Sequence, residues 1–241
     1  MVGKMNASRT ARERVRAELI GEIKDVARRQ LAVDGATGLS LRAVARELGM
    51  VSSAIYRYFP SRDELLTALI IEAFNAVGEA AEAADAACPR DRYLDRWMAI
   101  CRAIRAWALA NPHEYALIHG SPVPGYVAPQ DTVAPAARDA FVMAAILRDA
   151  EGAGKLTPRT AGLPPVPPSF AQDAERLRET LFAPLSHDVI LQALMAWTSV
   201  YGTISFELFG MYKNVIEDRA ATFDYNALAQ AHLLGLTPAP R

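Results

Sequence analysis

The chain has 241 residues, 51% of them hydrophobic, which is enough for a buried core in one large or two smaller domains. Its two cysteines, Cys88 and Cys101, match no zinc or redox spacing, and no N-terminal apolar run ends in a small-residue cleavage site. We therefore expect a reduced, cytoplasmic protein. Apolar stretches such as 65–73 and 189–196 fall short of the ~20 residues that span a bilayer, which argues against a membrane partner.

The charge is divided unevenly along the chain. Residues 1–62 hold twelve Lys and Arg against six Asp and Glu, whereas residues 63–241 hold fourteen against twenty-one. The net charges are therefore +6 and −7. A basic segment confined to one end is what contact with nucleic acid at that end requires, because only the surface that faces the duplex gains from neutralising phosphates. A solvated charged helix is the alternative explanation.

Three helices are predicted within the first sixty residues. The first carries an apolar stripe and ends at Asp34-Gly35, where glycine suits a C-cap. Ser40 is expected to cap a second helix of about two turns, which Gly49 stops. A third short helix must fit between Val51 and Phe59, because Pro60 prevents its continuation. The stripe of the first helix consists of Leu19, Ile23, Val26, Ala27 and Leu31.

Helical periodicity continues through the rest of the chain, with almost no alternating strand pattern. A capping-box pattern at residues 61–64 opens a long fourth helix, and further helices are predicted over 91–110, from Pro112, over 134–150 and from Ser169. Residues 120–129 form a loop, and 162–168, with four prolines, form an irregular connector or a disordered flap. Two last helices run from Ser186 to Gly210 and from Tyr225 to Leu236. The predicted fold class is all-α.

The second and third helices have the pattern of a helix-turn-helix, whose second member lies in the DNA major groove. Ile55 and Phe59 are four residues apart and are expected to face inward, which leaves other side chains on the opposite side. There, small hydroxyls let the backbone approach base edges, while tyrosine and arginine reach phosphate oxygens. The side chains expected on this DNA-facing side are Ser52, Ser53, Tyr56 and Arg57.

Two runs of residues resemble the TetR family of transcriptional regulators. They are SLRAVARELG at 40–49 and IYRYFPSRDEL at 55–65. The resemblance implies a three-helix DNA-binding domain over 1–62 and a larger helical ligand-binding and dimerisation domain over 63–241. It further implies a homodimer, formed by the two last helices, that binds a double-stranded DNA operator and a small-molecule effector.

The resemblance also assigns roles to residues of both runs. Arg42 matches the base-contacting position of the second helix, and Tyr56 matches a phosphate-contacting tyrosine. Arg62, where the family usually has lysine, would contact phosphate beside a helix N-terminus. Val51 stands where the family places a capping Ser or Thr, so Ser52 either caps the third helix or reads a base. Ser40 and Tyr58 complete the expected DNA-binding set, although Tyr58 is equally well explained as a packing residue.

The C-terminal part carries no phosphate loop, nucleophile elbow or paired metal ligands, so we expect neither an enzyme nor a cofactor. Its aromatic and methionine side chains suit either a core or a ligand pocket. The run from Trp197 to Gly202 followed by Glu207 resembles the WHG-like effector domains of the family, with Tyr201 in place of histidine. The expected pocket residues are Trp107, Phe141, Met195, Trp197 and Tyr201.

The leading hypothesis is a ligand-responsive regulator, in particular a repressor that a small apolar or amphipathic effector releases from a palindromic operator. An activator differs only in where its operator lies. The alternative from another class is an all-helical enzyme or lipid-binding protein whose basic end contacts acidic surfaces. An enzyme needs a nucleophile, a base and an orienting group, and the sequence supplies no such set.

Overall fold

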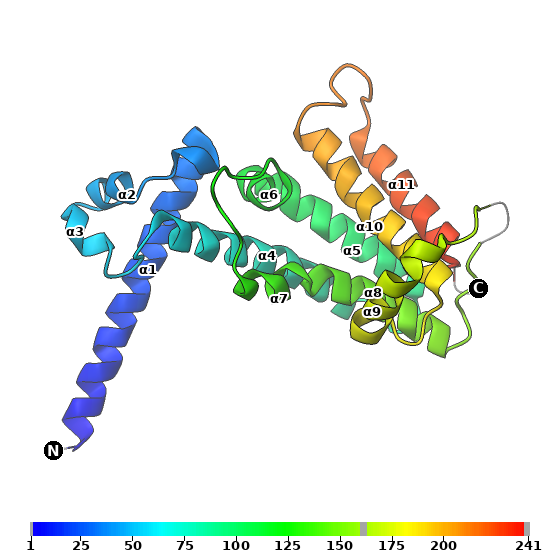
Figure 1. Cartoon of the computed structure of the whole chain (residues 1–241), viewed down its shortest axis with the longest axis horizontal. Helices are drawn as coiled ribbons and strands as arrows, with labels where there is room; N and C mark the ends of the chain where they lie inside the picture. Colours follow the sequence, from blue (N-terminus) through cyan, green and yellow to red (C-terminus); the bar gives the residue numbers. More distant parts are fainter. Residues whose placement is uncertain (1, 160–162, 239–241) are drawn as a thin grey trace. The chain divides into compact units, whose positions relative to one another are not determined.

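The computed structural model describes residues 2–159 and 163–238, and these ranges contain helices and connecting segments but no strand (Figure 1). The all-α prediction is therefore confirmed. The longer helices are α1 (Val2–Gly38), α4 (Arg62–Ala86), α5 (Tyr93–Ala110), α8 (Arg138–Gly152), α10 (His187–Leu208) and α11 (Arg219–Leu234). The short ones are α2 (Leu41–Glu47), α3 (Ser52–Ile55), α6 (Pro112–His119), η1 (Gln130–Thr132), α7 (Val133–Ala136), η2 (Pro168–Phe170), α9 (Ala171–Leu177) and η3 (Arg178–Phe182).

The chain divides into two compact units. The first unit consists of residues 1–73 and 113–132, and the second of residues 74–112 and 133–241. This division differs from the predicted one after residue 62 in two respects. It falls inside the continuous helix α4, and it groups most of α6 and the following loop with the N-terminal helices.

Helix α1 forms the base of the first unit. Its apolar stripe is buried at Ile23, Val26 and Ala27, as the spacing predicts. The backbone leaves helical geometry at Gly35, with φ +68°, a conformation that glycine adopts without strain. The helix also extends well before Leu19, the first residue of the predicted stripe, because residues 2–18 are helical too.

Short caps and a glycine turn shape the helix-turn-helix. The Ser40 hydroxyl accepts a hydrogen bond from the Ala43 N–H at 3.4 Å and begins α2. Gly49 then adopts φ +66° in the turn before α3. Val51 holds the N-cap position of α3 and makes no capping bond, so Ser52 is the first helical residue and not the cap. Ser61 begins α4, accepting from the Glu64 N–H at 3.1 Å.

Ion pairs join α6 to the other helices of the first unit. The Arg28 guanidinium on α1 lies 2.6 Å from the carboxylate of Glu72 on α4 and 3.0 Å from that of Glu114 on α6. Lys24 pairs with the same Glu72 at 2.5 Å. Glu72 is thus shared by two cations, and Arg28 pairs with carboxylates on both α4 and α6. This arrangement accounts for α6 belonging to the N-terminal unit although it is distant in sequence.

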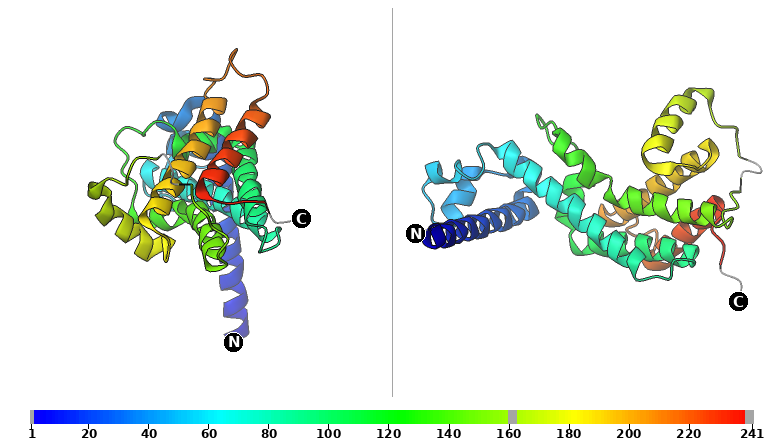
Figure 2. Two further views of the ribbon diagram at one scale, coloured as in Figure 1. Left: turned by 90° about the vertical axis from the view of Figure 1, so that its right-hand side faces the viewer. Right: turned by 90° about the horizontal axis from the view of Figure 1, so that it is seen from below.

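Helices α10 and α11 lie side by side in the second unit and pack on α5 (Figures 1 and 2). The Trp97 indole N–H of α5 donates to the Ala227 carbonyl of α11 at 2.9 Å. Helix α11 begins six residues before the predicted start at Tyr225, because Asp218 supplies an unforeseen N-cap. Helix α10 is the one helix in the described ranges long and apolar enough to cross a membrane, and its buried face packs inside this bundle.

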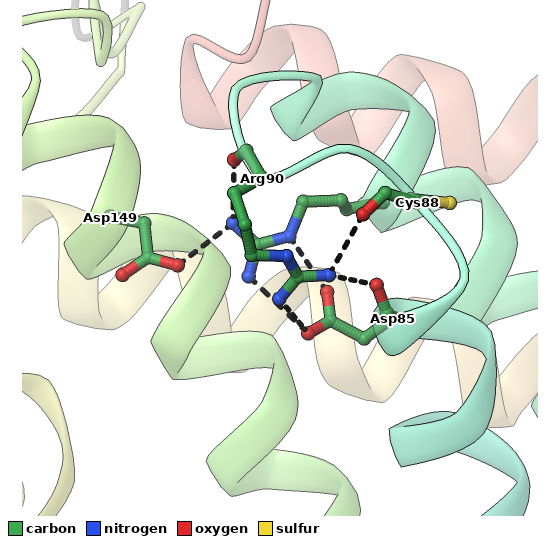
Figure 3. A network of polar contacts seen from close by, with 5 residues as sticks. Asp85, Cys88, Arg90 and Asp149 are labelled. Atoms are coloured by element: carbon green, nitrogen blue, oxygen red, sulfur yellow. Dashed lines mark hydrogen bonds and ion pairs between the residues drawn. The ribbon is translucent and has the colours of Figure 1, made fainter.

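A buried arginine links three helices of the second unit. Arg96 on α5 is 1% exposed, and its guanidinium donates to Asp85 near the end of α4 at 2.7 Å and to Asp149 on α8 at 2.8 Å. It also donates to the Arg90 carbonyl at 3.1 Å, and Arg90 in turn pairs with Asp85 (Figure 3). The network fixes the turn between α4 and α5 against α8.

Candidate nucleic-acid interface

One side of α3 and the turn after it is buried and the other is exposed. Ile55 and Phe59 are buried, as expected for inward-facing positions, and so is Ala54. The exposed residues are Ser52, Ser53, Tyr56 and Arg57, and Tyr56 has 42% of its surface exposed. The structure thus brings these four predicted residues onto accessible positions around one short helix. Ser52 is not the N-cap of α3, so its hydroxyl is available at the surface.

Arg42 stands on the exposed side of α2, while Leu41, Val44 and Ala45 of the same helix are buried. Within the described part of the chain, the guanidinium groups of Arg42 and Arg57 have no carboxylate partner. An unpaired guanidinium keeps its five N–H donors for a ligand such as a base edge or a phosphate. The arrangement is chemically suited to docking on a duplex.

Ser40 has a different role from its exposed neighbours. Its hydroxyl is the α2 cap, and its backbone N–H donates to the Gln30 side-chain oxygen at 3.3 Å. The residue is half-buried. Its clearest contribution is to fix where α2 starts relative to α1 and so to position Arg42.

Arg62 is engaged inside the first unit, in contrast to the expected phosphate contact. Its Nη2 donates to the Ala36 carbonyl at 2.6 Å, and its Nε donates to the Leu39 carbonyl at 3.2 Å. Ala36 lies in the last turn of α1, after the break at Gly35, and Leu39 follows it, so the stretch 36–40 is treated as the connection between α1 and α2. Two directed hydrogen bonds to this connection make Arg62 a brace between it and the start of α4. The prediction that Arg62 contacts phosphate was based on the lysine that the family usually has at this position. The sequence alone did not show which backbone groups lie near Arg62.

Tyr58 packs against α1. The Arg16 guanidinium lies 5.2 Å from the centroid of the Tyr58 ring, within cation–π range, and its Nη2 donates to the Arg57 carbonyl at 3.5 Å. The packing alternative for Tyr58 is therefore the one that the contacts favour. Sequence reasoning missed Arg16, which lies in α1 just before the predicted apolar stripe and contacts the end of the helix-turn-helix.

The predicted ligand-pocket residues do not share one cavity among those described. Phe141 lines a space with Arg138 and Glu82, whereas Met195 lines another beside Gln192. Trp107 is half-buried on α5.

Trp197 and Tyr201 do converge, on a residue that the sequence analysis missed. The Trp197 N–H and the Tyr201 hydroxyl both donate to one carboxylate oxygen of buried Asp139, at 3.3 and 2.5 Å. Glu207 pairs with Arg105 through two hydrogen bonds of 2.7 and 2.8 Å. Neither Asp139 nor Arg105 carried a sequence signal, because each is one of several charged residues in its amphipathic helix.

Comparison with known proteins extends the sequence resemblance to most of the chain. Residues 23–69 match the family described as bacterial regulatory proteins, tetR family, and residues 97–229 match the tetracyclin repressor-like, C-terminal domain. The HTH-type transcriptional regulator Rv1816 of Mycobacterium tuberculosis (strain ATCC 25618 / H37Rv) is 41% identical over 230 residues, which cover 94% of this chain and 93% of that protein.

Two solved structures share the architecture. The crystal structure of SCO4313 is 33% identical, covers 91% of this chain and 98% of its own, and has a TM-score of 0.74. A protein of unknown function from Rhodococcus sp. RHA1 is 25% identical over 92% of this chain and 96% of its own, with a TM-score of 0.65. The narrower WHG-like subtype stays a prediction. The chain belongs to the TetR family of bacterial transcriptional regulators and is a DNA-binding regulator rather than an enzyme.

Proposed function

We propose that the chain is a cytoplasmic, ligand-responsive repressor that binds a palindromic operator as a homodimer and is released by a small effector. The observation that carries the DNA-binding part is the exposed side of α2 and α3, where Arg42, Ser52, Ser53, Tyr56 and Arg57 are accessible while the opposite side is core. Arg42 and the two serines would contact base edges, and Tyr56 and Arg57 would contact phosphates. Residues 1–62 form the DNA-binding domain in this proposal, and 63–241 the ligand-binding and dimerisation domain.

Dimerisation through α10 and α11 is supported by the side chains that these helices leave exposed. Phe206 and Phe209 at the end of α10 and Tyr225 on α11 are large, and all are roughly half or more exposed. Large apolar side chains that stay exposed on neighbouring helices are typical of a site of association. A single helix-turn-helix also reads few base pairs, so two copies related by a two-fold axis suit a palindromic operator.

The experiment is to sequence DNA fragments that the purified protein retains from a random pool, with its mass in solution measured in parallel. We expect enrichment of an inverted repeat whose half-sites lie about one helical turn, or roughly 34–36 Å, apart, and a mass of two chains. Retention of unrelated sequences without a common motif would contradict the proposal. A monomer that binds one asymmetric half-site tightly would contradict the dimeric part.

A further inference from the structure

A cavity of about 390 Å³ lies in the second unit, along the N-terminal half of α10 and the segment 163–166. Its volume is in the range of small-molecule sites. Leu163, Val166, Leu191 and Met195 contribute apolar walls, together with two prolines of the segment. The polar lining residues are Asp188 and Gln192. The cavity is distinct from the place where Trp197 and Tyr201 meet Asp139.

Gln192 is 7% exposed, and only one end of its amide has a partner. Its Nε2 donates to the Arg159 carbonyl at 3.4 Å, and because a carbonyl can only accept, this contact fixes which end of the amide is the nitrogen. The Oε1 atom is buried and has no hydrogen-bond partner in the described part of the chain. A buried acceptor without a donor is costly, so it marks a place where a donor would be bound favourably.

The backbone that orients this amide is itself held in place. The Arg159 N–H donates to the Leu233 carbonyl at 3.0 Å, and the Thr157 N–H donates to the Gly235 carbonyl at 3.3 Å. The segment 157–159 is thus hydrogen-bonded to the end of α11. Close approach is possible there because Gly235 has no side chain: a Cβ would lie 2.2 Å from the Thr157 carbonyl carbon. The Gln192 amide cannot simply turn over to pair its oxygen.

Asp188 lies one helical turn before Gln192, on the same side of α10, and its carboxylate is exposed. The polar lining residues are therefore a carboxylate and an amide whose oxygen is buried and unpaired, whereas no Lys, Arg or His of the described residues lines the cavity. A ligand that matches these groups must donate hydrogen bonds, carry positive charge and have an apolar body. An anion would meet repulsion from the Asp188 carboxylate.

We propose that this cavity binds a small apolar amine and is the effector site of the regulator. The ammonium group donates to Gln192 Oε1 and pairs with Asp188, while the apolar body packs on Leu191 and Met195. The effector role rests on the proposed function, but the binding site does not. Of the pocket residues predicted from sequence, only Met195 belongs to this site.

The test uses the full-length purified chain and three probes that share a body and differ in the head group, namely phenylbutylamine, phenylbutanol and phenylbutyrate. Titration calorimetry should show one amine per chain, with the alcohol binding about tenfold more weakly and the carboxylate weaker still. Equal affinities for the three probes, or no amine binding, would overturn the proposal.

Two substitutions locate the site. Asp188→Asn should weaken the amine about tenfold and leave the alcohol unchanged, since only the amine uses the charge. Gln192→Leu should weaken both, and it removes an unpaired buried acceptor, so the variant is expected to fold at least as well as the parent. The controls are Asp91→Asn and Gln172→Leu, the same substitutions at exposed positions outside the cavity. Undiminished binding by both cavity variants would refute the assigned position.

Operator binding is then measured with and without saturating phenylbutylamine. Release of the operator supports the effector role. Tight amine binding with unchanged operator affinity supports the site and overturns its regulatory role. A chain that binds the amine but no DNA sequence selectively overturns the proposed function instead, so the two failures are distinguishable. The second chain of a dimer could instead fill the cavity. In that case the amine would not bind, and Gln192→Leu would weaken the dimer. This result contradicts the proposal.

Discussion

Two arginines around the helix-turn-helix and three of the second unit have different surroundings. Arg42 on α2 and Arg57 just after α3 are exposed and have no carboxylate partner in the described ranges, whereas Arg96, Arg105 and Arg138 of the second unit are each paired with carboxylates. The unpaired groups keep their donors for a polyanion, and the paired ones fix helices to one another. The net charge of each part depends on how many charged residues it holds, and pairing decides which of its cations stay available to a polyanion.

Arg96→Leu should cause the largest loss of stability. It leaves Asp85 and Asp149 without their buried partner. Removing one member of a buried ion pair lowers the free energy of unfolding by ~3–5 kcal/mol. Urea unfolding measures the change. The matched control is Arg92→Ala, which removes an exposed pair with Asp95 and should cost less than ~1 kcal/mol. Similar losses for the two variants would mean that Arg96 is not a structural arginine.

The same network predicts a pH dependence. Burial acts to raise the pKa of Asp85, but the hydrogen bonds from Arg96 and Arg90 outweigh it and hold that pKa below its usual value. A carboxyl whose pKa is lowered by folding stabilises the folded chain above its ordinary pKa of ~4, and this contribution is lost as the pH falls further. The difference in unfolding free energy between parent and Arg96→Leu should therefore narrow below about pH 4.

Arg42→Ala should reduce discrimination between the operator and random DNA by ~1–3 kcal/mol, with unchanged folding stability, because the side chain has no internal partner. Footprinting titrations on both DNAs measure the difference. Arg148→Ala, at an exposed position of the second unit, is the control. An equal loss on every sequence would reassign Arg42 from a base contact to a phosphate contact.

Arg62→Ala distinguishes a brace from a phosphate contact. Loss of two hydrogen bonds to the connection between α1 and α2 should lower stability by ~1–2 kcal/mol. The slope of log affinity against log salt concentration should stay that of the parent, whereas a lost phosphate contact would flatten it by about 0.9. If Arg62→Ala flattened the salt dependence and left the folding stability equal to that of the parent, Arg62 would be a phosphate contact, as the family lysine suggested.

Tyr56→Phe should have the smallest effect of the four substitutions. It removes one hydroxyl from an exposed ring, so binding should weaken by ~0.5–1.5 kcal/mol, evenly across DNA sequences. Competition titrations with operator and random fragments measure this. A loss confined to the operator would indicate that the hydroxyl contacts a base and not a phosphate.

Local signals in the sequence were sufficient for most of the fold. The caps at Ser40, Ser61 and Ser186, the turn at Gly49 and the inward spacing of Ile55 are short-range features, and the structure has each of them. The exposed residues of α3 followed from the same periodicity. The sequence could therefore identify the surface that faces DNA in the proposed function.

Partners distant in sequence could not be predicted in this way. Arg62 binds carbonyls 23 and 26 positions away, and Tyr201 meets Asp139 across 62 positions. Such pairs depend on how helices pack, which periodicity does not encode. For the same reason, the residues that we predicted to share one pocket line different spaces. The buried amide oxygen of Gln192 was not among the predicted pocket residues.

Cleavage of operator DNA by a reagent tethered beside α3 tests the central claim most directly. Cys88→Ser leaves Cys101 as the only native thiol, and burial both shields it and raises its pKa. Iron-EDTA is then attached to Val51→Cys, at a position 71% exposed, or to the control Val215→Cys, 75% exposed in the second unit. We predict cleavage from position 51 at two symmetric places within the operator, and none there from position 215. Uniform cleavage from both positions, or localised cleavage from position 215 alone, would contradict DNA recognition by α2 and α3.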